Sequence, residues 1–192
     1  MENNLFTNSM KIAHSMCINK LKTGDIAVDA TMGNGNDTIF LGSLVGPAGK
    51  IYSFDIQKKA LEATRKKVAQ KCFSERIVLI NDGHENMDKY IKEKVKLVIF
   101  NLGYLPGGDH NITTKAETTL SALKKAINLI EINGLILLVV YPGHPEGKIE
   151  KDILLKYTSA LDQKKYNVFK LCFINEVNNP PMLIAIEKRI CL

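Results

Sequence analysis

The feature that most constrains the fold is a regular alternation of short apolar segments with amphipathic segments of ten or more residues. Short apolar runs predict buried strands, and apolar residues spaced three or four apart predict helices. Because each strand–helix–strand connection places its helix against one face, this order predicts a parallel sheet covered on both faces. The predicted strands are residues 26–30, 50–55, 77–80, 96–101, 135–140, 166–174 and 182–187, and the predicted helices are residues 9–21, 36–45, 57–71, 115–130 and 145–160, with a short helix after Asp82.

The length and composition predict one globular domain over residues 1–192. A chain of 192 residues can fill one core and is short for two. The content of 45% hydrophobic and 24% charged residues is typical of globular proteins and argues against disorder. No apolar run reaches the roughly 20 residues that span a bilayer, and the first residues lack the basic head and apolar stretch of a signal peptide. We therefore expect a cytoplasmic protein without a membrane partner.

The four cysteines are widely scattered and form no Cys-x-x-Cys pair. Such pairs are typical of zinc and redox sites, so we predict no metal site and reduced thiols.

Polar residues and glycines follow the ends of the first two predicted strands, where a doubly wound sheet binds its ligand. After the first strand the chain reads Asp29-Ala30-Thr31-Met32-Gly33-Asn34-Gly35, and glycines there let the backbone approach a ligand. The second strand ends at Asp55, whose carboxylate is suited to accept hydrogen bonds from ribose hydroxyls. A tight turn without a ligand and an exposed acidic helix cap are the alternatives. Together the two features favour a nucleoside-containing cofactor.

The residues after the loop indicate which cofactor. A dinucleotide site requires a third glycine, but this chain has Asn36-Asp37-Thr38, and the carboxylate would repel phosphate. S-adenosylmethionine carries no phosphate and is cationic, so an acidic loop suits it. A nicotinamide-dependent oxidoreductase and a non-catalytic nucleoside-binding module are the alternatives. The predicted cofactor-binding residues are Asp29, Thr31, Gly33, Asn34, Gly35, Asn36, Asp37, Asp55, Ile56, Gln57, Asp82, Gly83, His84 and Asn101.

The fourth predicted strand ends in Asn101-Leu102-Gly103-Tyr104, which resembles the Asn/Asp-Pro-Pro-Tyr signature of amino-group methyltransferases but lacks both prolines. In that signature the Asn side chain accepts hydrogen bonds from the target amine and the aromatic ring packs against the target. The resemblance therefore assigns catalytic roles to Asn101 and Tyr104. An alkyl amine is largely protonated at neutral pH, so the site must also favour its free base. Asp109, His110 and His144 are the candidates for that role, and a lid or a turn without chemistry is the alternative for each.

As a set, these segments resemble the small bacterial rRNA methylases of the YtqB type over nearly the whole chain. The segments that carry the resemblance are residues 29–38, 54–57, 83–85, 101–109 and 141–144. The family implies a Rossmann-like class I methyltransferase fold, α/β, with a seven-stranded, mostly parallel sheet, a C-terminal antiparallel hairpin and helices on both faces. One departure is Gly83, where the family is expected to have serine.

Members of that family look like MnmM-type enzymes, which methylate the 5-aminomethyl group of 2-thiouridine at the tRNA wobble position. The resemblance thus implies tRNA as the substrate; rRNA, a protein or a small metabolite stays open. The net charge of +6 favours encounter with a polyanion such as RNA. A homodimer is possible, and residues 1–22 are expected to pack near the cofactor site.

Overall fold

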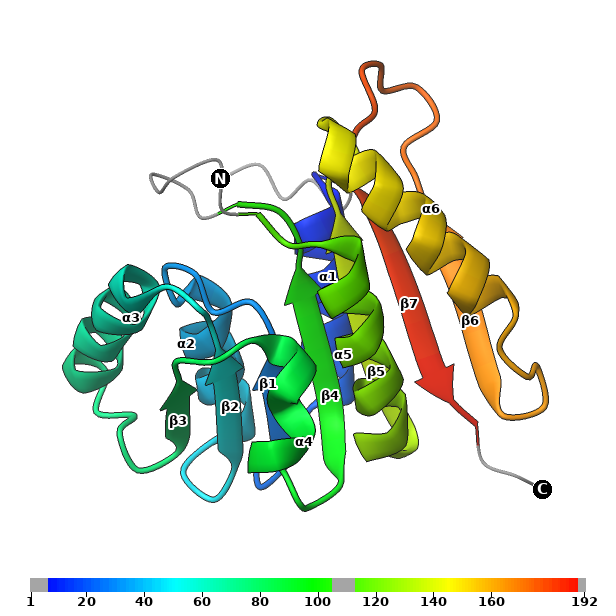
Figure 1. Cartoon of the computed structure of the whole chain (residues 1–192). Helices are drawn as coiled ribbons and strands as arrows, with labels where there is room; N and C mark the ends of the chain where they lie inside the picture. Colours follow the sequence, from blue (N-terminus) through cyan, green and yellow to red (C-terminus); the bar gives the residue numbers. More distant parts are fainter. Residues whose placement is uncertain (1–6, 105–112, 190–192) are drawn as a thin grey trace.

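The structure, a computed structural model, describes residues 7–104 and 113–189. Seven strands form one sheet in the order β3-β2-β1-β4-β5-β7-β6 (Figure 1). The strands are β1 (Ile26–Asp29), β2 (Lys50–Phe54), β3 (Ile77–Ile80), β4 (Val95–Asn101), β5 (Ile130–Val140), β6 (Tyr166–Leu171) and β7 (Met182–Lys188). The first five strands are parallel, and β7 runs antiparallel to both β5 and β6. The predicted mostly parallel sheet with a closing antiparallel hairpin is confirmed.

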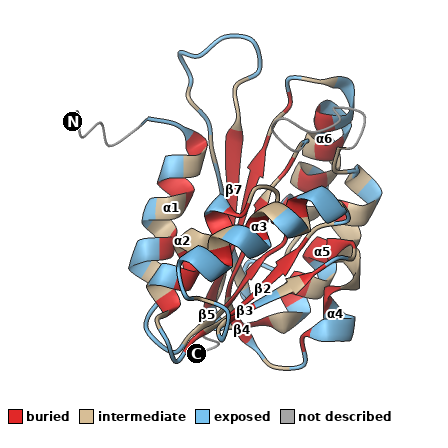
Figure 2. Ribbon diagram, turned by 90° about the vertical axis from the view of Figure 1, so that its left-hand side faces the viewer, coloured by how far each residue is buried: buried red, intermediate tan, exposed pale blue. Residues whose placement is uncertain are grey.

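Helices cover both faces of the sheet, and each face has its own apolar core. Side chains of β4 alternate between the two cores, as the two-residue period of a strand requires: Leu97 and Ile99 face one, and Val98 and Phe100 face the other. The helices on the first face are α1 (Ser9–Lys20), α2 (Asn36–Val45) and α3 (Lys58–Gln70), and those on the second are α4 (Met87–Tyr90), α5 (Ala116–Leu129) and α6 (Pro145–Ser159), with a 3₁₀ turn, η1 (His84–Asn86), before α4. Figure 2 shows buried strands between helices whose outer surfaces are exposed.

Two strand boundaries differ from the predicted ones by three residues or more. Strand β5 begins at Ile130, five residues earlier than predicted, because Ile130 pairs with Val95 across a register shift. Glu131, Asn133 and Gly134 interrupt the apolar run before Leu135, so the sequence did not predict this pairing. Strand β6 ends at Leu171, three residues early, where its last partner is Leu183. Prolines at 180 and 181 precede β7 and have no N–H to extend the ladder.

The sheet places the ends of β1, β2, β3 and β4 at one edge. Strand order reverses between β1 and β4, because β2 and β3 lie on one side of β1 while β4 and β5 lie on the other. A crevice outside the carboxyl ends of the strands is expected at such a point.

Helix α1 is tied to this edge at its beginning. The Asn8 side chain accepts a hydrogen bond from the Lys11 N–H at 2.8 Å, which caps the helix, and the Ser9 hydroxyl donates to the Pro181 carbonyl at 2.7 Å. In the described residues, no helix is both long and apolar enough to cross a membrane.

Candidate functional site

A cavity of about 770 Å³ opens at the carboxyl edge of the sheet. Its volume lies within the range of roughly 300–1,000 Å³ that is usual for sites binding small molecules. Among the predicted site residues, those that line it are Thr31, Gly33, Asn34, Asn36, Asp37, Asp55, Ile56, Gln57, Asp82, Gly83, His84, Asn101, Tyr104 and His144. Asp29 and Gly35 do not line it, and Asp109 and His110 lie outside the described residues.

Asp55 is held at the cavity wall by backbone donors. The Gly33 N–H donates to its Oδ2 at 2.9 Å, and the Gln57 N–H donates to its Oδ1 at 2.8 Å. Burial raises the pKa of the Asp55 carboxyl, and the two backbone donors oppose that rise. Each carboxylate oxygen can accept more than one hydrogen bond, so both remain able to bind a ligand hydroxyl. Asp55 thus joins the loop after β1 to the end of β2.

Asp29 lies behind the loop instead of facing the cavity. It is fully buried, and its carboxyl group accepts from the Thr31 N–H at 3.1 Å and the Thr38 hydroxyl at 2.6 Å. Burial raises the pKa of Asp29 from 3.8 to about 7, and the negative charge of Asp37 adds to the rise. Its position makes Asp29 a support for the loop. The sequence could not show this, because the end of a strand is compatible with either direction.

Gly35 serves packing between helices. Its φ of 77° is in the left-handed region, and a Cβ there would lie 2.5 Å from the Thr64 Oγ1 on α3. The glycine therefore lets the start of α2 approach α3, whereas the sequence predicted that it lets a ligand approach the backbone.

Strand β3 is followed by Asp82 and His84, whose polar groups are mostly engaged. The Asp82 carboxylate accepts from the Gly83 N–H, the Asn86 side chain and the Tyr90 hydroxyl, at 2.7, 2.9 and 2.9 Å. His84 Nδ1 donates to the Ala30 carbonyl at 3.1 Å, which leaves Nε2 as an acceptor. Burial lowers the pKa of His84, which favours the neutral ring. His84 Nε2 is buried and has no hydrogen-bond partner among residues 7–104 and 113–189.

The side chain of Asn101 is oriented by a chain of contacts that begins on α1. His14 Nε2 contacts Asp37 Oδ1 at 2.7 Å, and Asn101 Nδ2 donates to Asp37 Oδ2 at 3.4 Å. The His14 ring also stacks on Phe40, with ring centroids 4.1 Å apart. Because a carboxylate only accepts hydrogen bonds, Asp37 selects the amide orientation in which Asn101 Oδ1 is the free acceptor.

The other side of the cavity is built by a buried acidic residue on α6. Glu150 is 1% exposed and accepts from the Thr119 hydroxyl at 2.6 Å and the Thr114 hydroxyl at 3.1 Å. The Gly103 N–H donates to Thr114 Oγ1 at 3.0 Å, and the Thr114 N–H donates to the Gly103 carbonyl at 3.0 Å. Burial raises the pKa of Glu150. Glu150 therefore fixes the chain on both sides of residues 105–112.

His144 lies near Tyr104 in this part of the cavity, with ring centroids 6.4 Å apart. It caps α6, because its Nδ1 accepts from the Gly147 N–H at 3.1 Å. In the neutral ring Nε2 then carries the proton, and it has no partner in the described part of the chain. The neutral ring thus offers Nε2 as a donor, and the role of His144 with the amine proton stays a prediction.

His14 and Glu150 organise the site without lining the cavity, and both were missed from the sequence. Glu150 could have been found, because it lies three residues after Gly147 and four before Leu154 on the buried stripe of α6. A carboxylate on such a stripe indicates a buried polar contact. His14 gave no such signal, since its partner is 23 residues away.

Residues 51–187 match the model of a family described as "Putative rRNA methylase". A chloroplastic tRNA (mnm⁵s²U34)-methyltransferase from Arabidopsis thaliana is 39% identical over 93% of this chain and 69% of its own length. A solved structure from Clostridium thermocellum with the family's description has 50% identity and a TM-score of 0.94, covering 95% of this chain and 98% of its own. A methyltransferase structure from Streptococcus mutans, in complex with SAH, has 39% identity and a TM-score of 0.87, covering 95% and 99%.

These relatives resemble the chain both in sequence and in fold. The family match includes the end of β2, the end of β3, all of β4 and the start of α6, which carry Asp55, His84, Asn101 and His144. These matches confirm the family resemblance and the class I fold, and they favour a methyltransferase over an oxidoreductase. This chain belongs to the rRNA methylase family and is an S-adenosylmethionine-dependent class I methyltransferase.

Proposed function

We propose that this protein methylates the 5-aminomethyl group of 2-thiouridine at the wobble position of tRNA. The observation that carries the proposal is the fixed amide of Asn101, whose Oδ1 is left to accept a hydrogen bond from an amine. An amine held this way has its lone pair directed by the protein before reaction, which is the main requirement of a displacement in line. The Arabidopsis relative, named for this reaction, supports the choice of substrate.

The residues of the cavity fit S-adenosylmethionine. Asp55 offers two carboxylate oxygens to ribose hydroxyls, and Ile56 next to it is 61% exposed in the cavity wall, where an adenine ring would cover it. Asp37 supplies a negative charge toward a cationic donor. When bound, the cofactor supplies a methyl group attached to a positively charged sulfur. The other residues proposed to bind the cofactor are the predicted ones that line the same cavity: Thr31, Gly33, Asn34, Asn36, Gln57, Asp82, Gly83 and His84.

The substrate side of the cavity would hold the base. Tyr104 is 44% exposed and offers a ring for the base to pack against. His144 offers an N–H donor, which suits a base carbonyl or thiocarbonyl. For the amine proton, Asp109, His110 and His144 stay the candidates. Catalytic roles for Asn101, Tyr104 and these residues are part of the proposal.

The proposal is tested with tRNA from cells that lack the 5-aminomethyl methylation step. Incubation with the enzyme and labelled S-adenosylmethionine is expected to place the label on the wobble uridine, identified by mass spectrometry of nucleosides. Ribosomal RNA from the same cells is the control. Label in rRNA alone would reject the tRNA substrate and favour the rRNA alternative.

Asp55→Asn is expected to raise the Kd for S-adenosylhomocysteine about tenfold or more, since a lost hydrogen bond to a charged group costs about 1.5–3 kcal/mol. An amide has one acceptor oxygen, so it cannot serve both the Gly33 and Gln57 N–H groups and the ribose. Titration calorimetry measures the Kd. Asp25→Asn, which precedes β1 at the other edge of the sheet, is the matched control. An unchanged Kd in Asp55→Asn would remove Asp55 from the cofactor site.

The homodimer, the cytoplasmic location and the single-domain organisation stay predictions. Sedimentation velocity of the purified protein, alone and with tRNA, tests the first of them.

A further inference from the structure

The positive charge of the chain is concentrated on one helix. Residues 58–71, which comprise α3 and the residue after it, contain six basic residues and one acidic residue, Glu62, whereas the net charge of the whole protein is +6. The rest of the chain is therefore nearly neutral. The six basic residues are Lys58, Lys59, Arg65, Lys66, Lys67 and Lys71.

Lys58, Arg65 and Lys66 are exposed on the outer face of α3. In residues 7–104 and 113–189, no carboxylate lies within 4.0 Å of Lys58, Arg65 or Lys66. By contrast, Lys20 on α1 pairs with Glu187 at 2.6 Å, and Lys96 on β4 pairs with Glu131 at 2.8 Å. The field of α3 is thus not neutralised by neighbouring carboxylates.

The two cations at the start of α3 do not serve the stability of the helix. Lys58 and Lys59 occupy its first turn, which contains no acidic residue and has no side-chain cap. Cations at a helix N-terminus are repelled by the helix dipole, and acidic residues are the ones favoured there. A role outside the helix accounts for the charges of Lys58 and Lys59 better than a contribution to folding.

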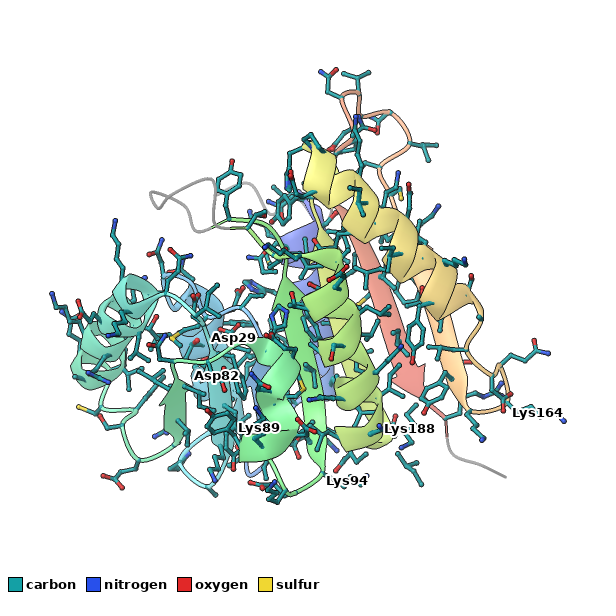
Figure 3. The ribbon with its side chains drawn as sticks, in the orientation of Figure 1. Asp29, Asp82, Lys89, Lys94, Lys164 and Lys188 are labelled. Atoms are coloured by element: carbon teal, nitrogen blue, oxygen red, sulfur yellow. The ribbon has the colours of Figure 1, made fainter. Side chains whose placement is uncertain are left out.

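Helix α3 runs along the wall of the cavity. It begins directly after Ile56 and Gln57, which line the cavity. Its Thr64 hydroxyl donates to the Gly33 carbonyl at 3.1 Å, and its Lys67 Nζ donates to Asn36 Oδ1 at 2.7 Å. Figures 1 and 3 show the helix at the side of the molecule where β2 and β3 end, with side chains projecting outward from it.

We infer that the outer face of α3, formed by Lys58, Arg65 and Lys66, binds the phosphate backbone of the RNA substrate. The inference rests on the proposed function for the choice of RNA. S-adenosylmethionine has no phosphate, so the cofactor does not need this face. From Lys58 to Lys66 the helix extends about 12 Å, and a nucleic acid duplex presents several phosphates over that length. These contacts hold the RNA body beside the cavity and do not read its sequence.

The test compares two triple variants that remove equal charge. One is Lys58→Ala, Arg65→Ala and Lys66→Ala; the control is Lys156→Ala, Lys164→Ala and Lys170→Ala, exposed residues of α6, β6 and the turn between them. Figure 3 shows Lys164 on the side of the molecule opposite α3. Binding of unmodified tRNA is measured by fluorescence anisotropy over a range of salt concentrations.

For the α3 variant we expect the Kd for tRNA to rise about tenfold at 0.1 M salt, and the slope of log Kd against log salt to fall by about 2. The control is expected to match the wild type. The Kd for S-adenosylhomocysteine and the kcat at saturating tRNA should stay unchanged in both. Glu62→Lys adds a cation to the same face, so it should tighten tRNA binding and steepen the slope by about 1.

Equal weakening in both triple variants, or an unchanged slope in the α3 variant, would overturn the inference. Weaker tRNA binding by Glu62→Lys would also overturn the inference. The tighter binding expected of this variant cannot come from a loss of folding. The proposed function fails separately: if α3 governs tRNA binding but the wild type leaves the wobble uridine unlabelled, the surface stands and the modified nucleotide is wrong.

Discussion

Replacing Asn101 by alanine is expected to lower the kcat for tRNA methylation about 100-fold, the order of loss that follows misplacement of a reacting group. The variant removes the acceptor that Asp37 holds toward the cavity. The Kd for S-adenosylhomocysteine is expected to change little, because the ribose contacts are proposed for Asp55. Single-turnover methylation and calorimetry measure the two effects.

The same contacts predict graded effects at Asp37 and His14. An asparagine at 37 can donate or accept, so it no longer selects one orientation of the Asn101 amide. Asp37→Asn should therefore lower kcat by less than Asn101→Ala. His14→Gln retains a donor toward Asp37 and should exceed His14→Ala in kcat. If Asn101→Ala keeps the wild-type kcat, or loses cofactor binding in proportion, Asn101 does not orient the amine.

Asp29→Asn is expected to stabilise the protein in a pH-dependent way. The pKa of Asp29 is about 7 in the folded chain and 3.8 when exposed, so between these values the folded state holds a proton that the unfolded state has lost. Stability contributed by this group therefore falls as the pH rises through that range. Asparagine does not titrate, so the advantage of the variant should grow by about 2–3 kcal/mol between pH 5 and pH 8.

The substitution is compatible with the buried hydrogen bonds. The amide oxygen can accept from the Thr31 N–H, and the amide nitrogen can donate to Thr38 Oγ1, whose hydroxyl then donates to Ser53 Oγ at 3.0 Å. Urea unfolding at a series of pH values measures the free energy of unfolding, with Asp25→Asn as a control. An advantage that is constant with pH would show that Asp29 titrates near its ordinary pKa.

The fold could be predicted from the sequence because its strands are short apolar runs between amphipathic helices. The strand ends were predictable for the same reason, and they located Asp55 and Asn101 at the cavity. The direction in which residues face was not predictable. Asp29 ends β1, and Gly33 and Gly35 follow it, yet only Gly33 lines the cavity, whereas Asp29 and Gly35 face the packed interior. Whether a side chain at a strand end faces a ligand or a neighbouring helix depends on how that helix packs.

Contacts between segments that are far apart in the sequence could not be predicted from it either. The orientation of Asn101 depends on Asp37, 64 residues away, and through it on His14 of α1. Asp109 and His110 lie outside the described residues, so their predicted roles stand untested.

Two hydrogen bonds join Gly103 and Thr114, and the Thr114 hydroxyl also donates to Glu150. This arrangement affects how related enzymes can diverge in sequence. Because the two ends are clamped together, an insertion or deletion between them adds little closure entropy and does not pull on β4. Relatives could thus acquire new nucleotide preferences by altering this stretch alone, while the methyl-donor half stays as it is.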